Sequence, residues 1–68
     1  MGRYIVYRKY TGGQSSESGF QIETEAEQDI YEATEDDRVM VATLIDNDNP
    51  GAPEVLLDFD KRRQNRAG

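Results

Sequence analysis

The most apolar stretch of the chain lies near its middle and predicts a central strand. Residues 39–45 read Val-Met-Val-Ala-Thr-Leu-Ile, without a charged side chain, in a sequence of which 32% is charged. The stretch is short, rich in β-branched residues and bounded by Arg38 and Asp46, which is typical of a strand covered on both faces. We therefore expect the rest of the chain to pair with this strand or to cover it.

Three further stretches have the pattern of strands. Residues 3–10 are rich in Tyr, Ile and Val, while residues 20–24 and 54–60 alternate apolar and polar positions as half-buried strands do. The segments between them, residues 11–19 and 46–53, are dominated by Gly, Pro, Ser, Asn and Asp and are predicted to be loops.

A helix is predicted between the second strand and the central one. Residues 24–27 fit a capping box with Thr24 as the N-cap, and apolar residues follow at positions i, i+4 and i+7. These apolar residues are Ala26, Ile30 and Ala33. We expect a helix from about Glu25 to Thr34. A competing interpretation makes residues 29–34 a strand that turns at residues 35–37 into the central one, and the sequence alone leaves both open.

The order strand, strand, helix, strand, strand predicts an α+β fold: a small four-stranded, mainly antiparallel sheet with one short helix, ββαββ. Residues 1–60 are expected to form a single domain, followed by a disordered basic tail at residues 61–68. The predicted core consists of Tyr4, Val6, Phe20, Ile22, Ile30, Val39, Val41, Leu44, Val55, Leu57 and Phe59.

The element order and length over residues 3–60 resemble the β-grasp arrangement of ubiquitin-like and sulfur-carrier proteins. Such carriers end in Gly-Gly, and the resemblance implies activation of the terminal glycine. This chain ends in Arg66-Ala67-Gly68, with one glycine, so a ubiquitin-like carrier is the weakest of our functional hypotheses. If the first and last strands are parallel neighbours, basic residues of both gather in one corner. These residues are Arg8, Lys9, Lys61 and Arg62.

The composition excludes several classes of protein. The chain has 68 residues and no Cys or His, which argues against disulfides, a thiolate metal site and an activated nucleophile. A chain of this size also lacks the bulk for a deep pocket, so we expect no enzyme and no cofactor. No segment approaches the roughly 18 apolar residues of a membrane span, and the N-terminus lacks the pattern of a signal peptide, so we expect a cytoplasmic protein.

The segment Asp46 to Gly51 has some features of a calcium loop. It offers oxygen ligands at alternate positions and a glycine at the sixth. However, Pro50 stands at the fifth position, and Leu57 stands at the twelfth, where a bidentate glutamate is required. We interpret the segment as a hairpin loop and expect no metal site.

The charges are divided unevenly along the chain. Residues 11–60 contain all 14 acidic residues and one base, which gives 1 − 14 = −13, whereas the two ends together carry seven bases, and the total is −6. This division argues against direct binding of nucleic acid by the acidic body. It favours a basic protein partner, self-association or a salt-rich setting. An edge strand without proline, such as the first, could also pair with a second copy into a homodimer.

The acidic residues of the predicted helix and the turn after it form the candidate binding site. Glu25, Asp29 and Glu32 share one helix face, and the following acidic residues extend it. The extending residues are Glu35, Asp36 and Asp37. Carboxylates spaced along a surface can imitate a phosphate backbone, as in DNA-mimic inhibitors from phages and mobile elements. We therefore predict a non-enzymatic module that binds a basic protein surface, such as that of a nucleic-acid-binding protein.

Two alternatives explain the acidity without a partner. Charge runs are commonly plain solvated surfaces, and proteins of extreme halophiles carry excess Asp and Glu with little Lys. The two lysines, six arginines and pI near 4.4 fit the second alternative, in which the acidity of a small cytoplasmic domain is adaptation to salt.

Residues 31–43 resemble a stretch of the phage uracil-DNA glycosylase inhibitor family. The resemblance spans thirteen of the 68 residues, consists mostly of an acidic turn and an apolar strand, and does not continue upstream. We draw no functional inference from it.

Overall fold

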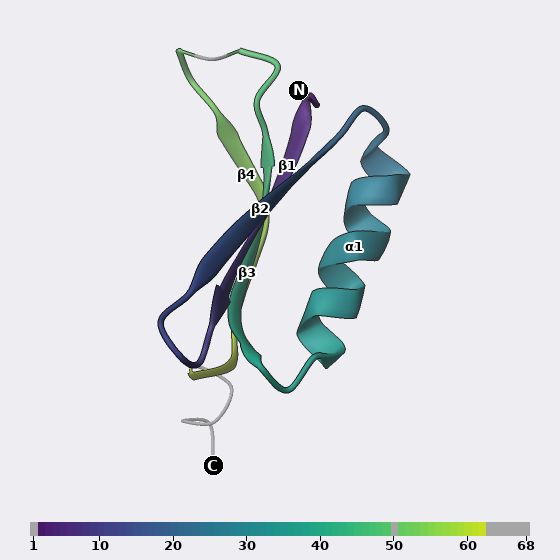
Figure 1. The fold of residues 1–68 in the computed structure, drawn as a ribbon. Coiled ribbons are helices and arrows are strands. Elements are labelled where there is room, and N and C mark those ends of the chain that lie inside the picture. Colours follow the sequence, from purple (N-terminus) through teal and green to yellow (C-terminus); the bar gives the residue numbers. More distant parts are fainter. Residues whose placement is uncertain (1, 50, 63–68) are drawn as a thin grey trace.

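One helix lies against one face of a four-stranded antiparallel sheet in the computed structural model (Figure 1). The structure describes residues 2–49 and 51–62. The elements, in order, are β1 (Tyr4–Tyr10), β2 (Ser15–Phe20), α1 (Glu23–Glu35), β3 (Val39–Asp46) and β4 (Glu54–Asp60). The predicted α+β class and the ββαββ order are confirmed, and residues 29–34 are helical rather than extended.

The strands lie in the order β2-β1-β3-β4, and every neighbouring pair is antiparallel. β1 is therefore an inner strand, not an edge as predicted, and the edges are β2 and β4. β1 and β4 run in the same direction but are separated by β3, so the condition for the predicted basic corner is not met. The element order, on which the resemblance to the β-grasp rests, is the one observed.

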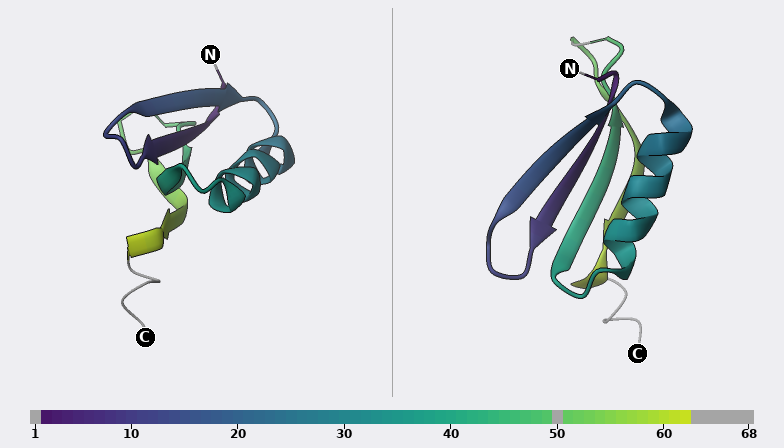
Figure 2. Two further views of the ribbon diagram at one scale, coloured as in Figure 1. Left: turned by 60° about the horizontal axis from the view of Figure 1, so that its bottom comes forward. Right: turned by 45° about the vertical axis from the view of Figure 1, so that its right-hand side comes forward.

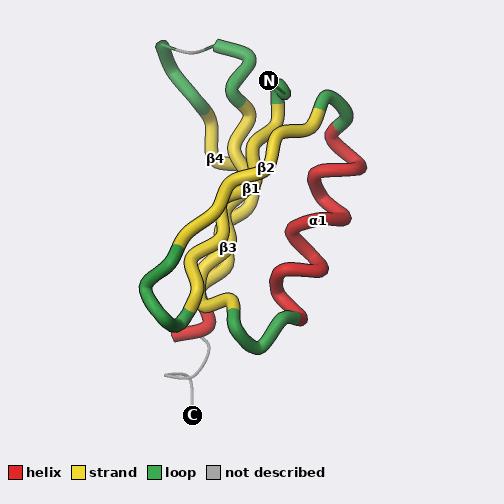
Figure 3. The backbone as a smooth tube through the Cα atoms, viewed as in Figure 1, coloured by secondary structure: helices red, strands yellow, loops and turns green. Residues whose placement is uncertain are grey.

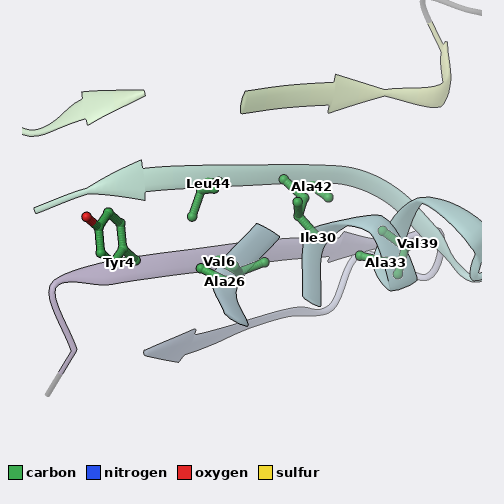
Figure 4. Packing of buried hydrophobic residues seen from close by; sticks show 8 residues of the cluster. All are labelled: Tyr4, Val6, Ala26, Ile30, Ala33, Val39, Ala42 and Leu44. Atoms are coloured by element: carbon green, nitrogen blue, oxygen red, sulfur yellow. The ribbon is translucent and has the colours of Figure 1, made fainter. Parts of the chain in front are cut away.

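The core lies between α1 and the inner strands. The left panel of Figure 2 shows α1 beside one face of the sheet. Ala26, Ile30 and Ala33 form the buried stripe of α1, as predicted. Figure 4 shows these side chains with buried residues of β1 and β3. The buried residues of the strands are Tyr4, Val6, Val39, Ala42 and Leu44. The three alanines allow α1 to lie close to the sheet, because a methyl group needs little space.

The second strand differs from the prediction. It spans Ser15–Phe20, inside the predicted loop, and not residues 20–24. Its five residues before Phe20 are exposed, so no apolar alternation marks them, and pairing with β1 decides their conformation. The turn from β1 closes through hydrogen bonds between Tyr10 and Gln14 and between Gly13 and Tyr10, and Gly13 has the positive φ of 90° that this turn requires.

The helix begins two residues before the predicted start. Ile22 occupies the N-cap position without a side-chain hydrogen bond, so the prediction of Thr24 as the N-cap is wrong. At the other end, the N–H of Asp36 donates to the carbonyl of Ala33, and the chain turns into β3. Figure 3 shows the α1–β3 and β1–β2 connections at one end of the molecule, and the β3–β4 and β2–α1 connections at the other.

Two predicted core residues are exposed, Ile22 by 53% and Val55 by 58%. Ile22 lies in the connection to α1, outside any strand. Val55 lies opposite Ile45 whereas Leu57 lies opposite Leu44, because the register shifts between these pairs. Val55 and Leu57 therefore point to opposite faces of the sheet, although their spacing in the sequence predicts one face.

The other predicted core residues divide by the face on which they lie. Phe20, Leu57 and Phe59 are partly buried on the helix side, and Val41 is half-buried on the face that α1 does not cover. Ala42 is fully buried beside Leu44 and was not among the predicted core residues.

The predicted tail begins beside the α1–β3 turn. Lys61 and Arg62 form a helical turn after β4, and Lys61 Nζ donates to the carbonyl oxygen of Asp36 at 2.6 Å. The rest of the predicted tail, residues 63–68, lies outside the described residues.

Candidate protein-binding surface

Helix α1 carries six carboxylates and no basic residue in its 13 positions. At 1.5 Å of rise per residue the helix is about 20 Å long, so it carries roughly one carboxylate per 3 Å. A single strand of duplex DNA carries one charge per about 3.4 Å along the axis. The density of charge along α1 is thus comparable to that along a DNA strand.

Asp29, one of the predicted binding residues, is bound to the sheet. Arg8 Nη2 on β1 donates to Asp29 Oδ1 at 2.8 Å and to the Asp29 carbonyl oxygen at 3.3 Å. The side chains of Arg8 and Asp29 are only 19% and 21% exposed. Arg8 Nε and Asp29 Oδ2 are buried and have no hydrogen-bond partner, so the pair is only partly satisfied. Removal of either partner alone leaves a charge without its counterion, so we assign this pair a role in holding α1 on β1.

Asp36, another predicted binding residue, shapes the turn after α1. Its Oδ1 accepts from the backbone N–H of Arg38 at 2.9 Å, and both oxygens accept from the Arg38 guanidinium. The hydrogen bonds from the side chain and the backbone of Arg38 hold the pKa of the Asp36 carboxyl below its usual value. The Asp36 carboxylate is therefore already bound to Arg38 within the protein.

The remaining predicted binding residues are exposed and form no ion pair among residues 2–49 and 51–62. They are Glu25, Glu32, Glu35 and Asp37. Glu25 and Glu32 share the flank of α1 that includes Asp29, while Glu35 lies farther from the sheet. Within the described part of the chain, a band of carboxylates along α1 is thus left without a cationic partner.

Ion pairing in the described part of the chain involves aspartates and no glutamate. The pairs are Arg3–Asp46, Arg3–Asp48, Arg8–Asp29, Arg38–Asp36 and Arg62–Asp60. Glu27 of α1, which was not among the predicted binding residues, likewise forms no ion pair within the described residues. It lies one turn before Tyr31, and Glu35 lies one turn after, a spacing that the sequence already contains.

An apolar groove of about 200 Å³ lies between the other flank of α1 and β4. It is lined by Ile30, Tyr31, Thr34, Leu57, Asp58 and Phe59. The groove exists because α1 packs on β1, β2 and β3 and barely touches β4. Tyr31 remains 59% exposed at its rim. Sequence reasoning missed this groove, because it depends on where the helix lies across the sheet.

A wider and more polar depression lies at the end of the β1–β2 hairpin. It is lined mainly by hydroxyl-bearing side chains and Arg38. Two of the hydroxyls, Tyr10 Oη and Ser16 Oγ, lie 3.2 Å apart and satisfy each other, and Arg38 is held by Asp36. We assign no function to this depression.

The side chains of the segment considered as a calcium loop form hydrogen bonds that stabilise the local chain conformation. Asp46 binds the Arg3 side chain and accepts from the N–H of Asp48, and Asn49 accepts from the N–H of Gly51. In the described residues, no three or more His, Cys, Asp or Glu side chains come together as metal ligands. Nor does that part of the chain contain a helix with the length and apolar character needed to cross a membrane. Gly68, on which a carrier role depends, lies outside the described residues.

Comparison with known proteins adds no relative: no family model, no curated protein and no solved structure matches this chain.

Proposed function

We propose that this protein is a binding module whose acidic helix side engages a basic surface on another protein, in the manner of a nucleic-acid mimic. One observation carries the proposal. Helix α1 has six carboxylates and no cation, and only Asp29 among them forms an ion pair within the described residues. Apart from Arg8, the arginines of the described residues bind aspartates outside α1, and the helix keeps a strongly negative charge.

The charge of this helix by itself lowers the stability of the folded protein. Pairs of like charges three or four residues apart, such as Glu32 with Glu35, each destabilise a helix by roughly 0.2–0.5 kcal/mol. No basic residue of the helix itself occupies the last turn; the cation at this end is Lys61, whose Nζ donates to the carbonyl oxygen of the C-cap residue Asp36. A cationic partner relieves this repulsion, so binding is favoured, and the exposed charge accelerates encounter with a basic surface.

Adaptation to a salt-rich solvent is the alternative explanation, and the few lysines support it. Dissolved salt screens charges beyond about 8 Å already at physiological ionic strength. Under this alternative the fold depends on high salt and the identity of the acidic residues does not matter. Under the proposed function the fold forms at low salt, and the position of the charges on α1 decides binding.

The test compares two variants with equal changes of charge. The helix variant combines Glu25→Gln with Glu32→Gln, and the control variant combines Glu17→Gln on β2 with Asp48→Asn in the β3–β4 loop; all four side chains are exposed. The assay measures how well each protein displaces a labelled DNA duplex from a panel of purified DNA-binding domains with basic surfaces.

We expect the unmodified protein to displace the duplex from at least one domain. The helix variant should be weaker by roughly three- to tenfold, since each exposed charge contact contributes up to about 1 kcal/mol. The control variant should match the unmodified protein. Absence of displacement from every domain, or equal weakening of both variants, would contradict the proposal.

A further inference from the structure

The free edge of β4 lies beside the apolar groove. β4 pairs with β3 on one side and, among the described residues, with no strand on the other, so this outer edge is open to a further strand. No proline interrupts its seven residues. On the helix side of this strand, Leu57 and Phe59 are only partly covered, and together with Tyr31 they line the groove. An extended segment placed along β4 would meet backbone and apolar contacts at once.

The other edge of the sheet lacks this combination. β2 is composed of Ser15, Ser16, Glu17, Ser18, Gly19 and Phe20, and its first five residues are exposed. The groove adjoins β4 alone among the two edge strands. The structure therefore distinguishes the two edges, and β4 is the one suited to recognition of apolar side chains.

The charge around β4 indicates which kind of segment would bind along this strand. Glu54 is exposed on the strand, Glu27 and Glu35 flank Tyr31 on α1, and none of them forms an ion pair in the described part of the chain. In an antiparallel β4–β4 pair, a second copy would bring a further exposed glutamate, its own Glu54, to the same edge. A second copy, with its net charge of −6, is thus disfavoured, and a cationic segment is favoured.

We infer that β4 accepts an extended, cationic segment of the partner protein, which adds to the sheet as a further strand and places apolar side chains beside the groove. Main-chain hydrogen bonds to the β4 edge provide affinity, and alternate side chains provide specificity. Side chains on the helix side lie against Leu57, Phe59 and Tyr31, and interspersed Lys or Arg residues face the glutamates. The cationic character of the segment rests on the proposed function.

Three synthetic octapeptides test the inference at low salt. The first alternates lysine and valine, the second alternates lysine and serine with the same charge, and the third is the first with alternate backbone nitrogens methylated. Binding to the full chain is measured by fluorescence anisotropy. Tyr31→Ser is the test variant, and Gln28→Ser, another exposed position on α1, is its matched control.

We expect the lysine–valine peptide to bind about tenfold or more tightly than the lysine–serine peptide, because it buries apolar side chains. Methylation of the backbone nitrogens that face β4 should weaken binding of the lysine–valine peptide by a similar factor. Tyr31→Ser should remove most of the preference for valine over serine, and Gln28→Ser should preserve it.

Equal binding of the valine and serine peptides would overturn the inference and leave the electrostatic proposal standing. Failure of both peptides to bind would overturn the inference and the proposed function together. A dimer of the unmodified chain in sedimentation that is dissociated by Tyr31→Ser would assign the groove to a second copy, and this would also overturn the inference.

Discussion

Individual aspartates and glutamates have separate roles in this protein. Asp36, Asp46 and Asp60 each accept a hydrogen bond from the backbone N–H two residues later, and each also binds an arginine side chain. The short aspartate side chain is suited to this, because it reaches its own backbone at the end of a strand or helix. Glutamate cannot close the same small ring, and Glu25, Glu32 and Glu35 of α1 are exposed to solvent. The sequence shows both residue types but not this division, since Arg8–Asp29 and Arg3–Asp46 join residues 21 and 43 positions apart.

The Asp46 carboxylate should make stability depend on pH. The hydrogen bond from Arg3 lowers the pKa of Asp46 in the folded protein, so its contribution is present above the unfolded pKa of about 3.9 and is lost as pH falls through the folded pKa. Urea denaturation between about pH 6 and pH 2 should show a steeper loss of unfolding free energy for the unmodified protein than for Asp46→Asn. Asp48→Asn, which removes a more distant contact with Arg3, should keep the steep slope. Parallel slopes for the unmodified protein and Asp46→Asn would refute this role.

At the scale of elements, apolar patterning predicted those parts of the fold that bury side chains on a regular period. β1, β3, β4 and the buried stripe of α1 all have this pattern, and the structure contains each of them. β2 lies at an edge with exposed side chains, so it buries too little to leave a pattern. Val55 was misplaced because a register shift cannot be recognised from alternation alone. The start of α1 was misplaced because Thr24 satisfies the capping motif while Ile22, a residue without capping ability, occupies the N-cap.

Substitution of this N-cap should stabilise the protein. Ile22 has the extended conformation of an N-cap, with φ of −117° and ψ of 129°, but offers no acceptor to the free N–H groups of the first turn. Ile22→Ser should raise the unfolding free energy by about 1 kcal/mol relative to Ile22→Ala, measured by urea denaturation. Ile22 is mostly exposed, so little apolar burial is lost in either variant. Equal stability of the two variants would show that the serine does not cap α1.

At the scale of the whole molecule, the acidic helix α1 and the edge strand β4 lie on either side of the apolar groove. The helix packs on β1, β2 and β3 and barely touches β4, which is an edge strand of the sheet. Among the described residues, the arginines pair with aspartates and the glutamates of α1 form no ion pair. The unequal charge of the chain was evident from the sequence, and it predicted an acidic helix. The groove and the free edge beside that helix were not predictable, because they follow from the position of α1 on the sheet and from the strand order.

One NMR titration tests the central claim that the carboxylates of α1 serve a partner rather than a salt-rich solvent. Amide spectra of the labelled full chain are recorded at about 0.05 M KCl, where surface charges are weakly screened, while the lysine–valine octapeptide is added. We expect a dispersed spectrum before addition, and then shifts concentrated in α1 and β4, with β2 and the β1–β2 turn unaffected. A spectrum that becomes dispersed only in molar KCl, or a folded protein whose α1 amides do not respond to the peptide, would contradict the claim.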